Sequence, residues 1–289
     1  MFADDTNIYF ESDNLKNLEK IMNKELKRLY EWLCLNRLSL NITKTNCVMF
    51  QARNKPKIPV TICINGQAVE EVAYVKYLGV LIDSQLTFKN HIDELNKKIS
   101  RAIGILNKLR PFVTTKILTN VYYAIVYPFL LYGIIIWGNA SNNLITSIHK
   151  LQKKFVRMAT NNDDHPVVPG PLVHTLPIFF KLNLLTIFDI YKLQVGKFVY
   201  ESINGIGPSQ NIVKFKKVSG VHNYNTRYAT SGGLFVGNVR TTQYGKGSLK
   251  IEGKNIWDTI PNKVKGCLTK KSFNVRFKKE LLKAYATVG

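Results

Sequence analysis

The chain has 289 residues, 45% of them hydrophobic, so it is long enough to bury a core, and its length excludes a mini-protein or a disordered tail. Its 41 lysines and arginines outnumber 19 aspartates and glutamates, and the formal net charge of +22 favours a polyanion, nucleic acid first, as partner. Four scattered cysteines without a C-x-x-C pair argue against a secreted disulfide scaffold and for reduced thiols in an intracellular protein.

The first 85 residues combine strand patterns with one long helix. Leucines and a methionine spaced three and four apart predict an amphipathic helix over residues 14–36, with Asp13 as its N-cap. Strand patterns occur in five stretches: residues 7–10, 45–50, 60–64, 68–72 and 77–82. The Asn65-Gly66 pair between two of them predicts a hairpin turn. This part therefore reads as an α+β unit.

Helical patterns dominate the rest of the chain. They cover four stretches: residues 86–109, most of 114–160, 182–203 and 272–286. Between them, residues 161–177 concentrate prolines, which predicts a linker and a domain boundary. Residues 166–289 hold 19 basic and 5 acidic side chains, so most of the positive excess lies after this linker.

One uncharged run, residues 117–138, is long enough to cross a bilayer. Thr119, Asn120 and a central Pro128 argue against a span, and so do tyrosines that are spread along the run. We expect residues 121–137 to be buried core, interrupted at Pro128. An integral membrane protein spanning 117–138 is the less favoured alternative.

The first chemical motif is Phe2-Ala3-Asp4-Asp5. Adjacent carboxylates at the turn of a strand suit Mg²⁺, which prefers oxygen ligands and binds through one or two carboxylates plus substrate phosphates. By itself such a pair is more often a solvated turn than a metal site. The motifs that follow it in the sequence favour the metal site.

Three segments, in this order, resemble the last three palm motifs of a reverse transcriptase: residues 2–6, residues 38–50 and residues 76–83. The family they resemble is the LINE-type (jockey/CR1-like) non-LTR retrotransposon reverse transcriptase. Looser similarity continues into residues 128–138, 222–227 and 257–261. The resemblance implies a C-terminal part of such an enzyme, with an α+β palm remnant in residues 1–85 and a mostly α-helical thumb in residues 86–160. It also implies a basic, helical or irregular C-terminal domain in residues 178–289, after the 161–177 linker.

The resemblance also implies a function and its site. The intact protein is expected to be an RNA-directed DNA polymerase that uses an RNA template, a DNA primer and deoxynucleoside triphosphates, works in the cytoplasm and nucleus, and has no membrane partner. Asp4 and Asp5 correspond to catalytic carboxylates that hold Mg²⁺, with Mn²⁺ as the alternative ion. Lys44 corresponds to the proton donor for pyrophosphate, and Tyr77, Leu78 and Gly79 correspond to the primer grip.

We expect Asp4 and Asp5 to lie at a hairpin turn that faces an open gap. The third carboxylate and the fingers of the family precede the motif, so we expect this chain alone not to extend a primer. The alternative function is a non-catalytic nucleic-acid-binding remnant of a truncated element.

Candidate contacts to nucleic acid lie on two helices and in the C-terminal part. They are Lys97, Lys98 and Arg101, then Lys150, Lys153, Lys154 and Arg157, then Arg227 and Tyr228. Basic side chains can contact phosphates, and aromatic rings can stack on unpaired bases. The plainer interpretation of the same residues is a solvated helix face and the core of a small domain.

Overall fold

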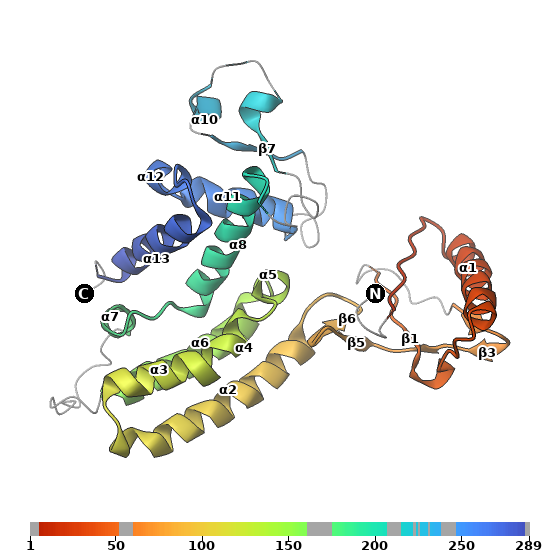
Figure 1. Cartoon of the computed structure of the whole chain (residues 1–289), viewed down its shortest axis with the longest axis horizontal. Coiled ribbons are helices and arrows are strands. Elements are labelled where there is room, and N and C mark those ends of the chain that lie inside the picture. Colours follow the sequence, from red (N-terminus) through yellow and green to blue (C-terminus); the bar gives the residue numbers. More distant parts are fainter. Residues whose placement is uncertain are drawn as a thin grey trace. The chain divides into compact units, whose positions relative to one another are not determined.

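The computed structural model describes residues 6–51, 60–160, 175–206, 215–221, 224, 226–230, 232–237 and 247–286 (Figure 1). The chain forms two compact units, Met1–His91 and Ile92–Gly289. Each unit is described by itself.

The first unit is built around helix α1 (Leu15–Leu35). Asn14 caps the helix, because its side chain accepts a hydrogen bond from the Lys16 amide at 2.9 Å. The predicted cap, Asp13, is therefore wrong by one position. The buried side of α1 presents Leu18 and Met22, which pack with Ile62. The hydrophobic spacing thus predicts both the helix and its inner face.

The strands of this unit are short and pair two by two. A 3-10 turn (η1, Ile42–Lys44) leads into β1 (Asn46–Cys47), which lies parallel to β4 (Glu70–Glu71). The hairpin β2 (Cys63–Ile64) and β3 (Gln67–Ala68) turns at Asn65-Gly66, as predicted, with positive φ at both turn residues. β5 (Tyr74–Tyr77) and β6 (Val80–Asp83) form a second antiparallel hairpin.

The strands predicted over residues 7–10 and 45–50 differ from the structure. Residues 7–10 have no strand assignment, and of the predicted strand 45–50 only Asn46 and Cys47 pair. A strand requires a neighbouring strand for its backbone hydrogen bonds, and no segment in the described part of the chain supplies one there. Alternation of side chains predicts where a strand can form but not whether it has a partner.

Asn23 joins α1 to the β2–β3 hairpin. Its amide nitrogen donates to the Thr61 carbonyl at 3.0 Å, and its amide oxygen accepts from the Cys63 amide at 2.8 Å. One side chain therefore satisfies two backbone groups at the start of β2 and fixes the hairpin against the helix.

The second unit is almost entirely helical. After α2 (Lys89–Leu109) come the short turn η2 (Arg110–Phe112), α3 (Thr115–Ile125), α4 (Tyr127–Leu131), α5 (Ile134–Trp137) and α6 (Asn142–Thr160). The later elements are α7 (Leu176–Lys181), α8 (Ile187–Ile203), β7 (Lys216–Lys217), η3 (Val218–Gly220), α10 (Arg227–Thr230), β8 (Leu234–Phe235), α11 (Leu249–Thr259), α12 (Asn262–Lys265) and α13 (Lys270–Ala286). The fold is thus mostly α-helical with a few short strands, which is compatible with the predicted α+β class.

The predicted helical stretch 114–160 forms four helices. Pro128 lies in the first turn of α4, and Gly133, with φ of 63°, separates α4 from α5. Six side chains along these helices are almost fully buried: Leu118, Tyr122, Val126, Leu130, Ile134 and Trp137. The interruption at Pro128 is confirmed, and one face of residues 121–137 is core as predicted, whereas Tyr132 and Ile136 on the other face are exposed. Within the described residues no helix combines the length and the apolar character that a membrane span requires.

Helices from both sides of the predicted linker share one core. α6 contacts α7 and α8, and α13 contacts α7 and α8 (Figure 1). Tyr200 of α8, Trp257 of α11 and Phe273 of α13 stack their rings with Phe273 in the middle. Residues 161–174 of the linker lie outside the described residues.

Candidate nucleic-acid interface

The β5–β6 hairpin contains the residues predicted to grip a primer. Tyr77 ends β5 and pairs with Val80, and Leu78 and Gly79 form the two-residue turn with φ of 45° and 81°. The sequence pattern of one strand over 77–82 is therefore wrong, because the chain reverses at Leu78-Gly79. Two consecutive positive φ angles match the twist of a tight hairpin, and glycine adopts such an angle without strain.

Asp83 fixes the end of this hairpin, a role that the sequence analysis missed. Its carboxylate accepts hydrogen bonds from the amides of Gln85, Thr87 and Phe88 and from the Thr87 hydroxyl, at 2.7–3.1 Å. Leu86 and Phe88 have positive φ angles, so α2 begins at Lys89 and not at residue 86 as predicted. An aspartate followed by polar residues just before a helix was the available signal.

The strand-like segment that follows the Asp4-Asp5 motif lies beside the hairpin. Burial first, and next the neighbouring Tyr77 side chain, raise the pKa of Tyr9. Both tyrosines line an open groove of about 1270 Å³, together with residues of α1 and of segment 45–51. Lys44 lies exposed at the end of η1, where its amide donates to the Asn41 side chain at 3.2 Å.

The proposed metal ligands Asp4 and Asp5 lie outside the described residues, as does the hairpin turn expected for them. In the part of the chain that the structure describes, no three His, Cys, Asp or Glu side chains gather in a way that would hold a metal ion.

The outward face of α6 carries four basic side chains. Lys150, Lys154 and Arg157 are exposed and Lys153 is half-exposed, while Phe155 and Val156 on the other face are buried. Residues 142–160 contain no carboxylate, and none of the four basic groups forms an ion pair within the described residues. We call these four side chains the α6 basic face. Their charges are available to an external anion.

Gln152 fixes the rotation of α6, and the sequence analysis missed it too. The side chain is 1% exposed, and its oxygen accepts from the Ile187 amide at 2.7 Å. Its nitrogen donates to the Tyr122 hydroxyl and to the Leu185 carbonyl, each at 3.2 Å. Because the Gln152 amide points into the core, the helical spacing turns Lys150 and Lys154 toward the outer face of α6.

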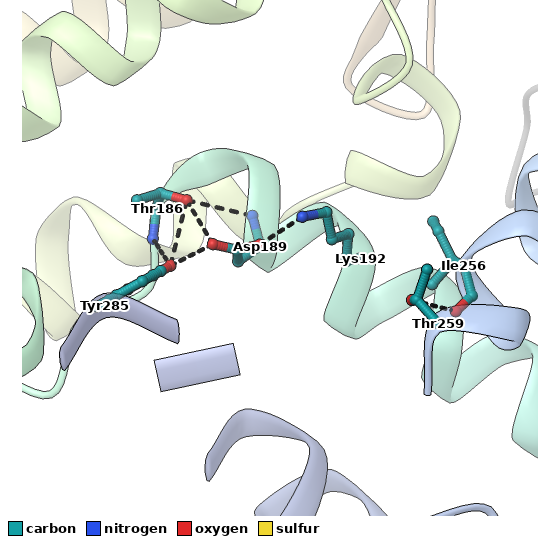
Figure 2. Close-up of polar contacts among 6 residues, drawn as sticks. All are labelled: Thr186, Asp189, Lys192, Ile256, Thr259 and Tyr285. Atoms are coloured by element: carbon teal, nitrogen blue, oxygen red, sulfur yellow. Dashed lines mark hydrogen bonds and ion pairs between the residues drawn. The ribbon is translucent and has the colours of Figure 1, made fainter. Parts of the chain in front are cut away.

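A buried polar cluster holds the start of α8 beneath α6. The Tyr285 hydroxyl hydrogen-bonds the Asp189 carboxylate and accepts from the Thr186 amide at 3.1 Å (Figure 2). Lys192 donates to the other carboxylate oxygen at 2.9 Å. Burial raises the pKa of Tyr285, so its hydroxyl stays protonated at neutral pH. The last helix of the chain is thereby tied to the loop that Gln152 also binds.

His149 lies on α6 between the core and the basic face. Its ring stacks on Phe179, at 5.8 Å between ring centroids. Burial, and next the charge of Lys153, lower the pKa of His149 below its usual 6.5. At neutral pH the imidazole is uncharged, so the positive charge of this face comes from its lysines and its arginine.

The predicted basic residues of α2 differ from one another. Lys97 and Arg101 are exposed, whereas Lys98 forms an ion pair with Glu94 at 2.5 Å. α2 is joined to α6 where Asn96 donates to the Ser147 hydroxyl at 2.7 Å. Lys98 is therefore partly neutralised, and Lys97 and Arg101 remain the stronger candidates for contact with phosphate.

The structure favours a structural role for Tyr228 over the predicted base-stacking role. Its hydroxyl donates to the Asp258 carboxylate, with both oxygens at 3.0 Å, and the Lys254 ammonium lies 5.1 Å from its ring centroid. The ring also packs against Gly233, where an added Cβ would approach it to 2.4 Å. Tyr224 is 78% exposed and keeps a ring that is available for stacking, beside exposed Arg227.

Comparisons with known proteins identify relatives of this chain. It is 28% identical over 192 residues to a probable RNA-directed DNA polymerase from transposon X-element of Drosophila melanogaster, covering 65% of this chain and 20% of that protein. It is 30% identical over 159 residues to the RNA-directed DNA polymerase from mobile element jockey of Drosophila funebris, covering 54% and 17%. A Pol polyprotein from a type-1 retrotransposable element R1 of Nasonia vitripennis is 24% identical over 112 residues, covering 37% and 27%.

The matches to the X-element and jockey polymerases span about a fifth of the length of those proteins. No protein-family model matches the chain. No solved structure matches it either.

Proposed function

We propose that the chain is the part of a reverse transcriptase that holds the RNA template and the DNA primer. The proposal starts from its relationship to the RNA-directed DNA polymerases of LINE-type retrotransposons. The observation that carries the proposal is the α6 basic face, which presents four cationic groups and no carboxylate. Nucleic-acid affinity depends mainly on neutralising phosphates, and unpaired cations on a rigid helix do this at low entropic cost.

In this proposal successive parts of the chain have different roles. Residues 1–85 are the palm remnant, in which the Leu78-Gly79 turn brings the hairpin backbone to the primer end and Tyr9 holds Tyr77 in place. Residues 86–160 act as the thumb. Asp4 and Asp5 would hold the Mg²⁺ or Mn²⁺ ions of the polymerase, and Lys44 would protonate the leaving pyrophosphate of each deoxynucleoside triphosphate.

The basic C-terminal part, residues 178–289, extends the contact with single-stranded RNA. Arg227 and Tyr224, both exposed, supply a phosphate contact and a stacking surface. A function in copying RNA into DNA puts the protein in the cytoplasm and the nucleus, where the element's RNA and its target DNA are found.

The test is to remove the α6 charges without disturbing the fold. We expect the triple variant Lys150→Gln, Lys154→Gln and Arg157→Gln to bind a single-stranded RNA oligonucleotide at least tenfold more weakly at low salt. Each phosphate contact on a single strand contributes about 0.7 to the slope of log affinity against log salt, so three lost contacts should reduce the slope by about 2. Fluorescence anisotropy over a salt series measures both quantities.

A matched control lies on α1. Lys20, Lys24 and Lys27 are exposed on a helix that also carries Glu19, Glu25 and Glu31, and Lys27 lies 3.9 Å from Glu31. The triple change of these lysines to glutamine removes the same charge but should leave the salt slope nearly unchanged. Equal losses in the two triple variants would mean that binding depends on net charge alone, and the proposal would fail.

A further inference from the structure

We propose that Lys278, Tyr123 and Tyr127 form a phosphate subsite that binds the backbone of single-stranded nucleic acid. None of these residues belongs to the α6 basic face. The inference rests on the proposed nucleic-acid function, and it names a contact that neither the sequence patterns nor the comparisons indicate.

Lys278 has no carboxylate partner within the described residues, whereas two other lysines of α13 do. Lys270 pairs with Glu201 at 2.5 Å, and Lys283 pairs with Glu280 at 2.7 Å. Lys278 is half-buried, and within the described residues it forms no ion pair. Burial lowers the pKa of the Lys278 ammonium. A partly desolvated cation without a counter-ion is unfavourable, so an anion that reaches it is bound well.

Most acidic side chains of the C-terminal part are already paired with other lysines. Residues 166–289 contain five acidic side chains. Four are already paired with other lysines: Asp189 with Lys192, Glu201 with Lys270, Asp258 with Lys254, and Glu280 with Lys283. The fifth, Glu252, is half-buried near Tyr191, whose pKa is raised first by burial and next by the charge of Glu252. The counter-ion of Lys278 is therefore expected from a ligand.

Tyr123 of α3 and Tyr127 of α4 complete the subsite. The Lys278 ammonium lies 5.7 Å from the Tyr123 ring centroid and donates to the Tyr123 hydroxyl at 3.4 Å. That hydroxyl donates in turn to the Asn183 carbonyl at 2.9 Å, which fixes the ring. The Tyr127 ring is 5.2 Å from the Tyr123 ring, and its hydroxyl has no hydrogen-bond partner in the described part of the chain.

The chemistry of these groups selects a phosphate. Burial raises the pKa of Tyr127, so its hydroxyl is a proton donor at neutral pH, as is the ammonium. An ammonium and a hydroxyl as free donors suit a tetrahedral anion with several acceptor oxygens. The adjoining aromatic rings offer an apolar surface to the sugar and base of a nucleotide, which favours a phosphodiester over free phosphate.

The experiment compares two lysines of the same helix in the full chain. Lys278→Gln should reduce the salt slope of binding to a single-stranded RNA oligonucleotide by about 0.7, the value for one phosphate contact. Lys283→Gln, which removes an exposed lysine already paired with Glu280, should leave the slope unchanged. Lys278→Arg keeps the charge and should therefore keep the slope. Tyr127→Phe should weaken binding but leave the salt slope unchanged. Thermal unfolding of each variant checks that the fold is intact.

Two further measurements separate the alternatives. Acetylation of Lys278 is measured by mass spectrometry in the presence of either the oligonucleotide or tripolyphosphate, at the same total concentration of phosphate groups. The oligonucleotide should suppress the acetylation, and tripolyphosphate should have little effect. Equal suppression by tripolyphosphate would assign the subsite to free phosphate and overturn the inference. If the α6 triple variant loses affinity while Lys278→Gln keeps the original slope, the Lys278 subsite alone is contradicted. If the unmodified chain does not bind RNA, the proposed function itself is contradicted.

Discussion

Tyr285, the most C-terminal buried side chain among the described residues, shows how one hydroxyl can join distant segments. It contacts Asp189 and the Thr186 amide, which are nearly a hundred residues away in sequence (Figure 2). Thr186 also caps α8, since its side chain accepts from the Asp189 amide. Removing the Tyr285 hydroxyl would leave a buried amide and a buried carboxylate oxygen without this partner.

We predict that Tyr285→Phe lowers the free energy of unfolding by about 1–3 kcal/mol, the cost of leaving buried polar groups unsatisfied. Tyr224→Phe is the control, because Tyr224 is largely exposed, and it should change stability by less than about 0.5 kcal/mol. Urea unfolding of both variants measures the difference. Equal stability of Tyr285→Phe and the unmodified chain would show that the buried cluster does not hold α13.

At the residue scale the sequence predicts types of side chain better than their partners. The positive charges of Lys98 and Lys150 are equally visible in the sequence, and the i,i+4 spacing of Glu94 and Lys98 was the available signal that one of them is paired. Tyr228 fits a basic and aromatic pattern, yet Asp258, 30 residues further along the chain, binds its hydroxyl. The pairing of Tyr228 with Asp258 depends on a tertiary contact, which spacing along the chain does not encode.

At the scale of elements, glycines set how closely the helices of the second unit approach. Gly196 of α8 lies against α13, where an added Cβ would come within 2.6 Å of Phe277 and 3.1 Å of Ile260. Gly104 of α2 has open space at the same position, with no atom within 4 Å. These two helical glycines therefore form a matched pair for the same substitution.

We predict opposite effects of alanine at these two sites. Gly196→Ala should destabilise the chain by about 1–3 kcal/mol, because the overpacked α8–α13 contact must shift. Gly104→Ala should stabilise it by up to about 1 kcal/mol, because alanine is the better helix former. Differential scanning calorimetry of the two variants tests the pair. A stabilising Gly196→Ala would contradict the close packing of α8 on α13.

Periodic patterns predicted the helices more reliably than the strands. The three- and four-residue spacing located α1, and Asn65-Gly66 located the β2–β3 hairpin. The same spacing missed the left-handed Gly133 that ends α4, and alternation missed the reversal at Leu78-Gly79. Helices are fixed by local hydrogen bonds, whereas a strand or a tight reversal depends on which segment lies beside it.

At the scale of the whole molecule, the positive charge is organised rather than uniform. On α1 lysines are interspersed with glutamates, and in residues 166–289 most acidic side chains are already bound by lysines. The α6 basic face is instead free of carboxylates and rigidly set by Gln152. Net charge and family resemblance were available from the sequence, but the choice of this face needed the structure.

The central claim is that nucleic acid lies on the α6 basic face. The most direct measurement is photochemical cross-linking of the full chain to an RNA–DNA primer-template that carries 4-thiouridine in the RNA strand, with the linked peptides identified by mass spectrometry. The account predicts cross-links within residues 142–160, which the α6 triple variant loses while the α1 triple variant keeps them. Cross-links confined to α1, with none in residues 142–160, would contradict it.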